Sequence, residues 1–140
     1  MSRFADFAAI DRPGVHIIVN PGGTNEQFVR SHIKHAAIVL HPDNTTIFAA
    51  LADGAADAMI TALVEARFQA AHNPLLCVAL HGARLSVTDK AVLMPRDAAL
   101  AGYVNLWLRQ IRADGHLDAV VSRYLPKTHR HLQYKVLTAH

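Results

Sequence analysis

Residues 15–25, VHIIVNPGGTN, carry the pattern that decides the fold: an apolar run, a turn and the start of a helix. The run His16–Val19 is continuous and β-branched, which is typical of a strand buried on both faces of a parallel sheet. Gly22 and Gly23 permit a tight turn and the close approach of a ligand to the backbone. The stretch therefore predicts a buried strand that ends in a strand-to-helix turn.

The helix after this turn offers a place for an anion. Thr24 and Gln27 have the spacing of a capping box, which predicts a helix that begins at Asn25. The first turn of a helix presents backbone N–H groups and the positive end of the helix dipole, and both suit a carboxylate or phosphate. An ordinary strand-to-helix turn without a ligand explains the same residues. Neither GxGxxG nor GK[ST] is present, so the turn is not a dinucleotide or Walker motif.

The composition is that of a folded domain with a real core. The chain has 140 residues, of which 51% are hydrophobic and 18% charged, and these values argue against disorder. No apolar run is long enough to span a membrane, and the N-terminal MSRFADFAAIDRPG has acidic residues and a proline too early for a secretory signal. We therefore expect no membrane insertion and, if Met1 is the native start, a cytoplasmic chain.

Charged and metal-ligating residues point to neither nucleic acid nor a metal. The formal charge is only +3, and the one basic cluster lies in a tail over residues 126–140 that has no aromatic stacking platform. Cys77 is the only cysteine and is expected to be a buried structural thiol. The closely spaced histidines lack acidic or cysteine partners at ligand spacing, so no metal and no cofactor is expected. These histidines are His32 with His35 and His129 with His131.

Strand and helix patterns alternate over residues 14–81. Such alternation with short links predicts a three-layer α/β fold with a parallel sheet and right-handed crossovers. Gly54 is expected to end the second helix as its left-handed cap. The predicted strands cover residues 15–20, 37–40, 57–61 and 76–80, and the predicted helices cover residues 25–35, 45–52 and 63–71.

The pattern changes in residues 82–125. After a connector, Lys90–Met94 predicts one further strand, and the helix that follows, over Asp97–Ala113, has an apolar face with a period of 3.6 residues. A second short helix is expected over His116–Leu125. The apolar face consists of Leu100, Tyr103, Val104, Trp107, Leu108 and Ile111.

Polar residues follow several of the predicted parallel strands. The C-terminal ends of such strands share one edge, and ligands of open α/β sheets bind there. Asn20, His41 and Thr61 stand at three of these ends, and Glu65 lies in the first turn of the next helix, so its carboxylate can point over the edge. The spacing alone favours a plainer interpretation, in which Glu65 only complements the positive end of its own helix.

Four segments together resemble the type II periplasmic binding proteins, and within that superfamily the cyclohexadienyl dehydratases. They are RPGVHIIVNPGGTNEQFVR, IVLHPDNTTIFAALADGAADAMIT, VEARFQ and KAVLMPRDAAL. The resemblance implies the second lobe of a two-lobed, periplasmic type of protein over residues 14–81, and a return strand and helices of the first lobe over residues 82–125. The N-terminal half of the family has no counterpart in this sequence.

The resemblance also implies an activity, the conversion of prephenate or arogenate into phenylpyruvate or phenylalanine. It places the proton donor at Glu65, since a positioned carboxylic acid assists the departure of hydroxide during decarboxylation and aromatisation. The family usually has aspartate where this chain has Ala62, which disfavours amino-acid ligands relative to a keto acid such as prephenate. The substrate-binding residues are expected to be Asn20, Gly23, Thr24, Asn25 and Thr61, around a small carboxylate.

The missing half has consequences for activity and assembly. A cleft with one wall neither excludes water nor orients a substrate, so the isolated chain is expected to be inactive or nearly so. The alternatives are a non-catalytic solute-binding remnant related to amino-acid transport receptors, and an interaction module. An unpaired strand edge and a large apolar patch recruit other chains, so we expect a homo-oligomer or a partner chain over the return segment.

Overall fold

The computed structural model describes residues 4–80, 85–86, 91–125 and 134–139, which divide into two units. The first unit comprises the described residues up to 86 together with residues 134–139, and the second comprises residues 91–125. Among the helices of the described ranges, none is both long enough and apolar enough to cross a membrane.

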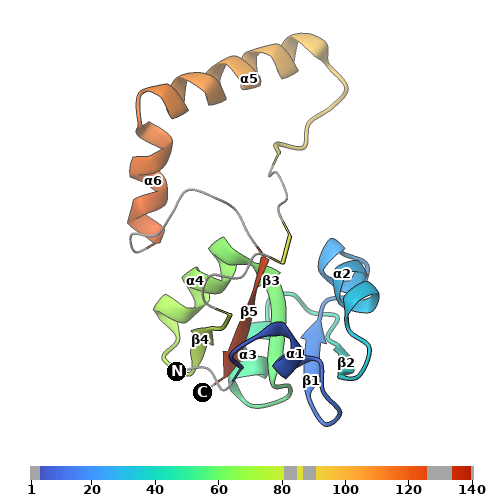
Figure 1. The fold of residues 1–140 in the computed structure, drawn as a ribbon. Coiled ribbons are helices and arrows are strands. Elements are labelled where there is room, and N and C mark those ends of the chain that lie inside the picture. The colour runs from blue at the N-terminus through green and yellow to red at the C-terminus, as the bar shows by residue number, and fades with distance from the viewer. Residues whose placement is uncertain (1–3, 81–84, 87–90, 126–133, 140) are drawn as a thin grey trace. The chain divides into compact units, whose positions relative to one another are not determined.

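The first unit is a five-stranded sheet with the strand order β2-β1-β3-β5-β4 (Figure 1). Its strands are β1 (His16–Val19), β2 (Ala37–Leu40), β3 (Ala58–Ala62), β4 (Leu76–Val78) and β5 (Tyr134–Ala139). Its helices are α1 (Phe7–Ile10), α2 (Thr24–His32), α3 (Ile47–Ala52) and α4 (Leu63–His72). The predicted alternation of strands and helices from β1 to β4 is confirmed.

Strand β1 lies inside the sheet and is buried on both faces, as its sequence predicts. Its residues Ile17, Ile18 and Val19 are fully buried. It pairs in parallel with β2 on one side and with β3 on the other, where Ile17 lies opposite Ala58. A strand covered on both faces has no exposed side to fill with polar residues, which explains its continuous apolar sequence.

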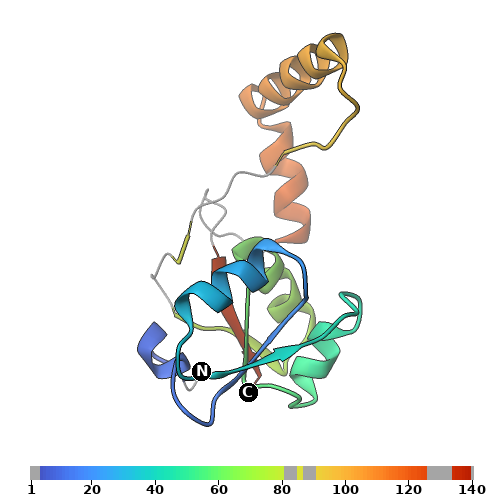
Figure 2. The same cartoon turned by 90° about the vertical axis from the view of Figure 1, so that its right-hand side faces the viewer.

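Helices cover both faces of this sheet, so the unit has three layers (Figures 1 and 2). Side chains of a strand alternate between its faces, and Ile17 and Val19 pack in one apolar cluster while Ile18 packs in the other. The first cluster includes Ile10 of α1 and Val29 of α2. The second includes residues of α3 and α4, namely Ile47, Phe48, Leu51 and Ala66.

Strand β5 corrects the prediction that residues 126–140 form only a basic tail. It lies between β3 and β4 and is antiparallel to both, with Leu137 opposite Met59 and Thr138 opposite Cys77. The four predicted strands β1 to β4 all run in the same direction, as the sequence predicted, and β5 is an additional antiparallel strand. The edge of β3 needs a hydrogen-bonding partner, and YKVLTA supplies β-prone residues with only one charge. The basic cluster of the tail, with His129 and His131, lies outside the described residues.

The described part of the second unit contains the helices α5 (Ala98–Ala113) and α6 (His116–Tyr124). Helix α5 begins where the Asp97 carboxylate accepts hydrogen bonds from the backbone N–H groups of Ala99 and Leu100, at 2.9 and 3.0 Å. The strand predicted over Lys90–Met94 is wrong for its described part, residues 91–94, which has no regular structure. A strand needs a neighbouring strand to pair with, and the described part of this unit contains only helices.

The predicted apolar face of α5 remains largely uncovered within the second unit. Tyr103 is 75% exposed and Trp107 is 55% exposed, while Ile111 is buried. Large apolar patches rimmed by polar residues mark surfaces that contact other molecules. The helix pattern is therefore confirmed, and the described residues of this unit leave most of the apolar face uncovered.

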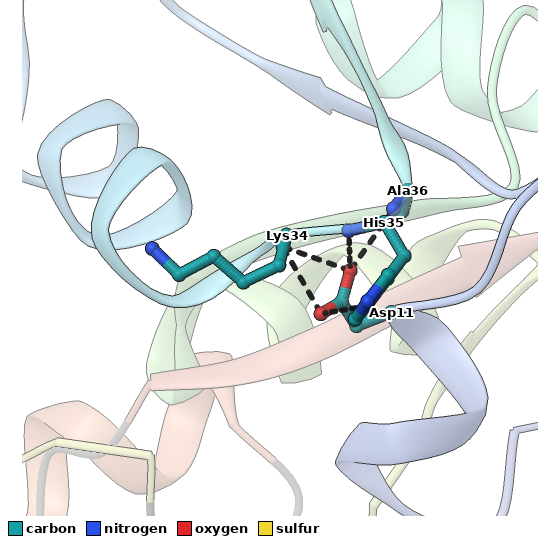
Figure 3. A network of polar contacts seen from close by, with 4 residues as sticks. All are labelled: Asp11, Lys34, His35 and Ala36. Atoms are coloured by element: carbon teal, nitrogen blue, oxygen red, sulfur yellow. Dashed lines mark hydrogen bonds and ion pairs between the residues drawn. The ribbon is translucent and has the colours of Figure 1, made fainter.

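A network around Asp11 ties the end of α1 to the turn before β2 (Figure 3). The carboxylate accepts hydrogen bonds from the backbone N–H groups of Lys34, His35 and Ala36, at 2.7–3.0 Å, and lies 3.2 Å from Nδ1 of His35. Burial raises the pKa of Asp11, but the hydrogen bonds from Ala36, His35 and Lys34 outweigh this effect and hold the pKa well below its usual range. The sequence offered no signal for this contact, because its partners are more than 20 residues apart.

Substituting Asp11→Ala should lower the free energy of unfolding at pH 7 by about 2–4 kcal/mol, because several N–H groups lose a charged acceptor. A carboxyl group whose pKa is lowered by folding stabilises the protein above its unfolded pKa and loses this effect as the pH falls. The difference from the natural chain should therefore shrink below about pH 4. Urea denaturation at several pH values measures both effects. Asp53→Ala, at an exposed carboxylate after α3, is the control, and equal losses from both variants would contradict the role of Asp11.

Candidate functional site

Strands β1, β2 and β3 end at one edge of the sheet (Figure 1), and the predicted site residues lie at or shortly after these strand ends in the sequence. These three strands are mutually parallel, so their C-terminal ends face the same way. Asn20 directly follows β1, His41 directly follows β2, and Thr61 is the penultimate residue of β3. The common edge that the sequence predicted for these residues is therefore present.

Asn20 joins the ends of two neighbouring strands. Its side-chain Nδ2 donates a hydrogen bond to the backbone carbonyl of His41, at 3.1 Å, and the side chain is half-buried. Nε2 of His41 lies 2.8 Å from the hydroxyl oxygen of Thr46. The Nδ2 group of Asn20 thus links the ends of β1 and β2. Direct contact of Asn20 with a substrate stays a prediction.

The turn after β1 forms as expected, but the helix begins one residue earlier than predicted. Gly22 has a φ of +84°, a conformation that a residue with a Cβ rarely adopts. Gly23 is the N-cap of α2, so Thr24 is the first helical residue and not the cap. The backbone N–H of Gln27 donates to the carbonyl of Gly23, at 3.2 Å. Extended backbone at Gly23 allows the chain to enter the helix without a side-chain cap.

Glu26 places a carboxylate at the start of α2 that sequence reasoning missed. One of its oxygens accepts a hydrogen bond from the backbone N–H of Gly22, at 2.6 Å, and the other accepts from Nε of Arg30, at 2.8 Å. The hydrogen bond from Gly22, followed by that from Arg30, lowers the pKa of Glu26 and keeps it ionised. A second anion at Gly23, Thr24 and Asn25 would therefore meet a negative charge. An acidic residue three positions after the N-cap was the available signal.

Glu65 lies in the first turn of α4, which follows β3 directly. The N-cap of this helix is Ala62, which offers no side-chain oxygen to the helix. The carboxylate of Glu65 is half-buried, and its Oε2 accepts a hydrogen bond from the hydroxyl of Thr61. Thr61 itself has no exposed surface. Glu65 is thus anchored from the strand as well as placed near the positive end of its helix.

This edge can bind an anion and exchange a proton. The α2 turn provides backbone N–H groups, and Glu65 provides a carboxyl group with one oxygen anchored by Thr61. Within the ranges that the structure describes, no three histidine, cysteine, aspartate or glutamate side chains are grouped so that they could hold a metal ion. His32 stacks on Phe28, with ring centroids 4.0 Å apart, and His35 contacts Asp11.

Comparison with known proteins gives relatives that are about twice as long. The chain is 42% identical over 139 residues to cyclohexadienyl dehydratase from Pseudomonas aeruginosa, a match that covers 99% of this chain and 49% of that protein. No protein-family model matches the chain. The chain thus spans about half the length of the curated relative that it matches.

Two crystal structures resemble this structure over most of the chain. One is an ancestral cyclohexadienyl dehydratase, with 36% identity and a TM-score of 0.54 over 89% of this chain and 52% of that one. The other is an ancestral amino acid-binding protein, a precursor of cyclohexadienyl dehydratase, with a TM-score of 0.64 over 87% of this chain and 52% of that one. Its 24% identity supports the fold alone.

The sequence match and the three-layer unit agree with each other and with the resemblance of the sequence motifs. The chain is similar to cyclohexadienyl dehydratases, has the fold of a periplasmic binding protein lobe, and spans about half the length of these relatives.

Proposed function

We propose that this chain forms the half of a cyclohexadienyl dehydratase that carries the general acid and a carboxylate-binding turn. The observation that carries this proposal is the position of Glu65, half-buried at the C-terminal edge of the parallel strands and anchored by Thr61. Identity of 42% to a cyclohexadienyl dehydratase over nearly the whole chain supports it. The substrate class is a small cyclohexadienyl keto acid such as prephenate.

In the proposed reaction, Glu65 protonates the ring hydroxyl of the substrate. The ring C–O bond breaks and water leaves, while the bond from the ring to its carboxylate breaks and releases carbon dioxide. The electron pair of that bond enters the ring, which becomes aromatic. Glu65 is left as a carboxylate and regains a proton from water before the next turnover. Hydroxide is a poor leaving group, so a positioned acid lowers the barrier.

The substrate's carboxylate is proposed to bind at the start of α2, through Gly23, Thr24 and Asn25. The N–H groups of this turn and the dipole of a nine-residue helix support the proposal. The ionised Glu26 opposes it, because its charge lies at the same helix end. We therefore expect weak binding, with a Kd on the order of millimolar, since a helix terminus contributes only ~0.3–1 kcal/mol beyond its hydrogen bonds.

Titration of the chain with prephenate should shift the backbone amide resonances of Gly23, Thr24 and Asn25. The variant Glu26→Gln should bind roughly 2–5-fold more tightly, a change of the size expected for one charge at a helix end, while glutamine still supports the cap. Asp53→Asn is the matched control, because it removes the same charge at an exposed position after α3. Shifts confined to other amides would show that the binding site is assigned wrongly.

Glu65→Gln should lower turnover by roughly 10²–10⁴-fold, the usual contribution of a positioned acid. The isolated chain should be inactive or nearly so, so the assay uses a complex in which the unmatched half of the Pseudomonas aeruginosa relative is supplied as a fusion. Formation of phenylpyruvate measures the rate, and Asp53→Asn serves again as the charge control. An unchanged rate for Glu65→Gln would remove Glu65 from the mechanism.

The exposed face of α5 favours a second role, as a surface for self-association. Tyr103 and Trp107 are more than half exposed, and burial of such side chains is strongly favourable. We propose that a second copy of this chain covers this face, because two copies related by a two-fold axis bury both faces in a closed assembly. This proposal stands apart from the catalytic one, since it involves the other unit.

At micromolar concentration, the chain should have the mass of a dimer by light scattering. Replacing Tyr103 and Trp107 by serine should convert it to a monomer, because the shared apolar surface is lost. Tyr124→Ser is the control, since Tyr124 is an exposed aromatic residue of α6 outside the face. A natural chain that remains monomeric up to tens of micromolar would contradict the proposal.

A further inference from the structure

We infer that Thr61 is a positioning residue, which orients the carboxyl group of Glu65 for proton transfer and does not itself contact the substrate. The inference rests on the proposed function of Glu65. Its basis is the hydrogen bond from the Thr61 hydroxyl to Oε2 of Glu65, together with the complete burial of Thr61. Direct binding of substrate by Thr61, as the sequence suggested, would require this side chain to become exposed.

Thr61 has a fixed position because β3 is held at this point by a neighbouring strand. Residues 58–62 of β3 pair with β5, and Thr61 lies opposite Lys135 in that register. The threonine side chain has few rotamers, since its Cβ carries two heavy atoms. Its hydroxyl is therefore a more rigid anchor than a group on an exposed loop would be.

A hydroxyl at this position needs an explanation, because the rest of β3 is apolar. The strand reads AMITA, and Thr61 is the one polar side chain in the fully buried class among the described residues. A buried hydroxyl is unfavourable unless it forms a hydrogen bond, and here the carboxylate of Glu65 accepts that bond. A valine would fill the same space without this requirement, so the hydroxyl indicates a function.

Glu26 and Glu65 have similar positions but different hydrogen bonds, and the difference leaves Glu65 as the one that can take part in a reaction. Both residues stand third in a helix that follows a parallel strand. Glu26 uses both oxygens, on Gly22 and Arg30. Glu65 is bonded through Oε2 to Thr61, and within the described part of the chain it forms no ion pair. Its Oε1 is thus the oxygen that can meet a substrate.

The hydrogen bond also distinguishes the two oxygens of Glu65. Because Oε2 accepts the Thr61 hydroxyl, we assign the transferred proton of the proposed acid to Oε1. After transfer, the same hydrogen bond stabilises the carboxylate that forms. A fixed orientation matters because proton transfer requires hydrogen-bond geometry in the transition state.

The geometry can be tested in the full chain without any activity. Nuclear magnetic resonance should show a slowly exchanging hydroxyl proton of Thr61 with Overhauser contacts to the side chain of Glu65. Thr61→Val should remove that resonance and let the Glu65 side chain average over several rotamers, whereas Thr61→Ser should retain both signals. A rapidly exchanging Thr61 hydroxyl, or a Glu65 side chain that is equally ordered in Thr61→Val, would overturn the inference.

The functional test uses the same fusion with the unmatched half of the Pseudomonas aeruginosa relative. Thr61→Val should lower kcat roughly 10–100-fold with little change in KM, and Thr61→Ser should keep kcat within about 3-fold of the natural chain. A change in KM alone would instead assign direct substrate contact to Thr61. If Glu65→Gln has no effect, the proposed function fails. If only Glu65→Gln has an effect, the inference about Thr61 fails by itself. Should Thr61→Val not fold, the hydroxyl resonance of the natural chain decides.

Discussion

The parallel pairing of β1 with β3 is the constraint on which the rest of the structure depends. Ile17 and Ile18 lie opposite Ala58 and Met59, so both strands end at the same edge. The helices that follow them, α2 and α4, therefore both begin at that edge. The backbone N–H groups of α2 and the carboxyl group of Glu65 therefore belong to helices that begin at the same edge, although about 40 residues separate them in the sequence. The chemistry proposed for this chain is a consequence of that register.

Sequence patterns correctly predicted the elements that are determined by residues close to one another in the chain. The apolar run of β1 and the left-handed Gly54 after α3 follow from burial and turn conformation within a few residues, and the structure confirms both. Strand β5 was missed, because six residues of ordinary β propensity do not reveal a partner strand some 75 residues away. The strand predicted before α5 failed for the same reason, since no pairing strand is present in the described part of its unit.

For the candidate site, the location could be predicted from the sequence, but the hydrogen bonds could not. Its place at the strand edge and the position of Glu65 followed from topology and from the motif resemblance. The hydrogen bond from Thr61 to Glu65 could not be derived from the sequence. The two residues are four positions apart, one in a strand and one in the following helix, and this spacing is compatible with several side-chain arrangements. The role of Glu26 was also missed. A capping pattern was recognised from Thr24 and Gln27, whereas the carboxylate one residue earlier forms the contact with Gly22.

The insertion of β5 between β3 and β4 has a consequence for how the chain reaches this structure. Residues 91–125 lie in the chain between β4 and β5, so the strand between β3 and β4 is synthesised after the other strands of this sheet. Pairings between segments far apart in sequence form slowly, because a long loop must close first. Until β5 has been synthesised, β3 and the short β4 each lack the neighbouring strand that forms hydrogen bonds with them in the complete sheet. Folding of the first unit thus depends on the synthesis of β5, which completes a sheet that begins more than a hundred residues earlier in the sequence.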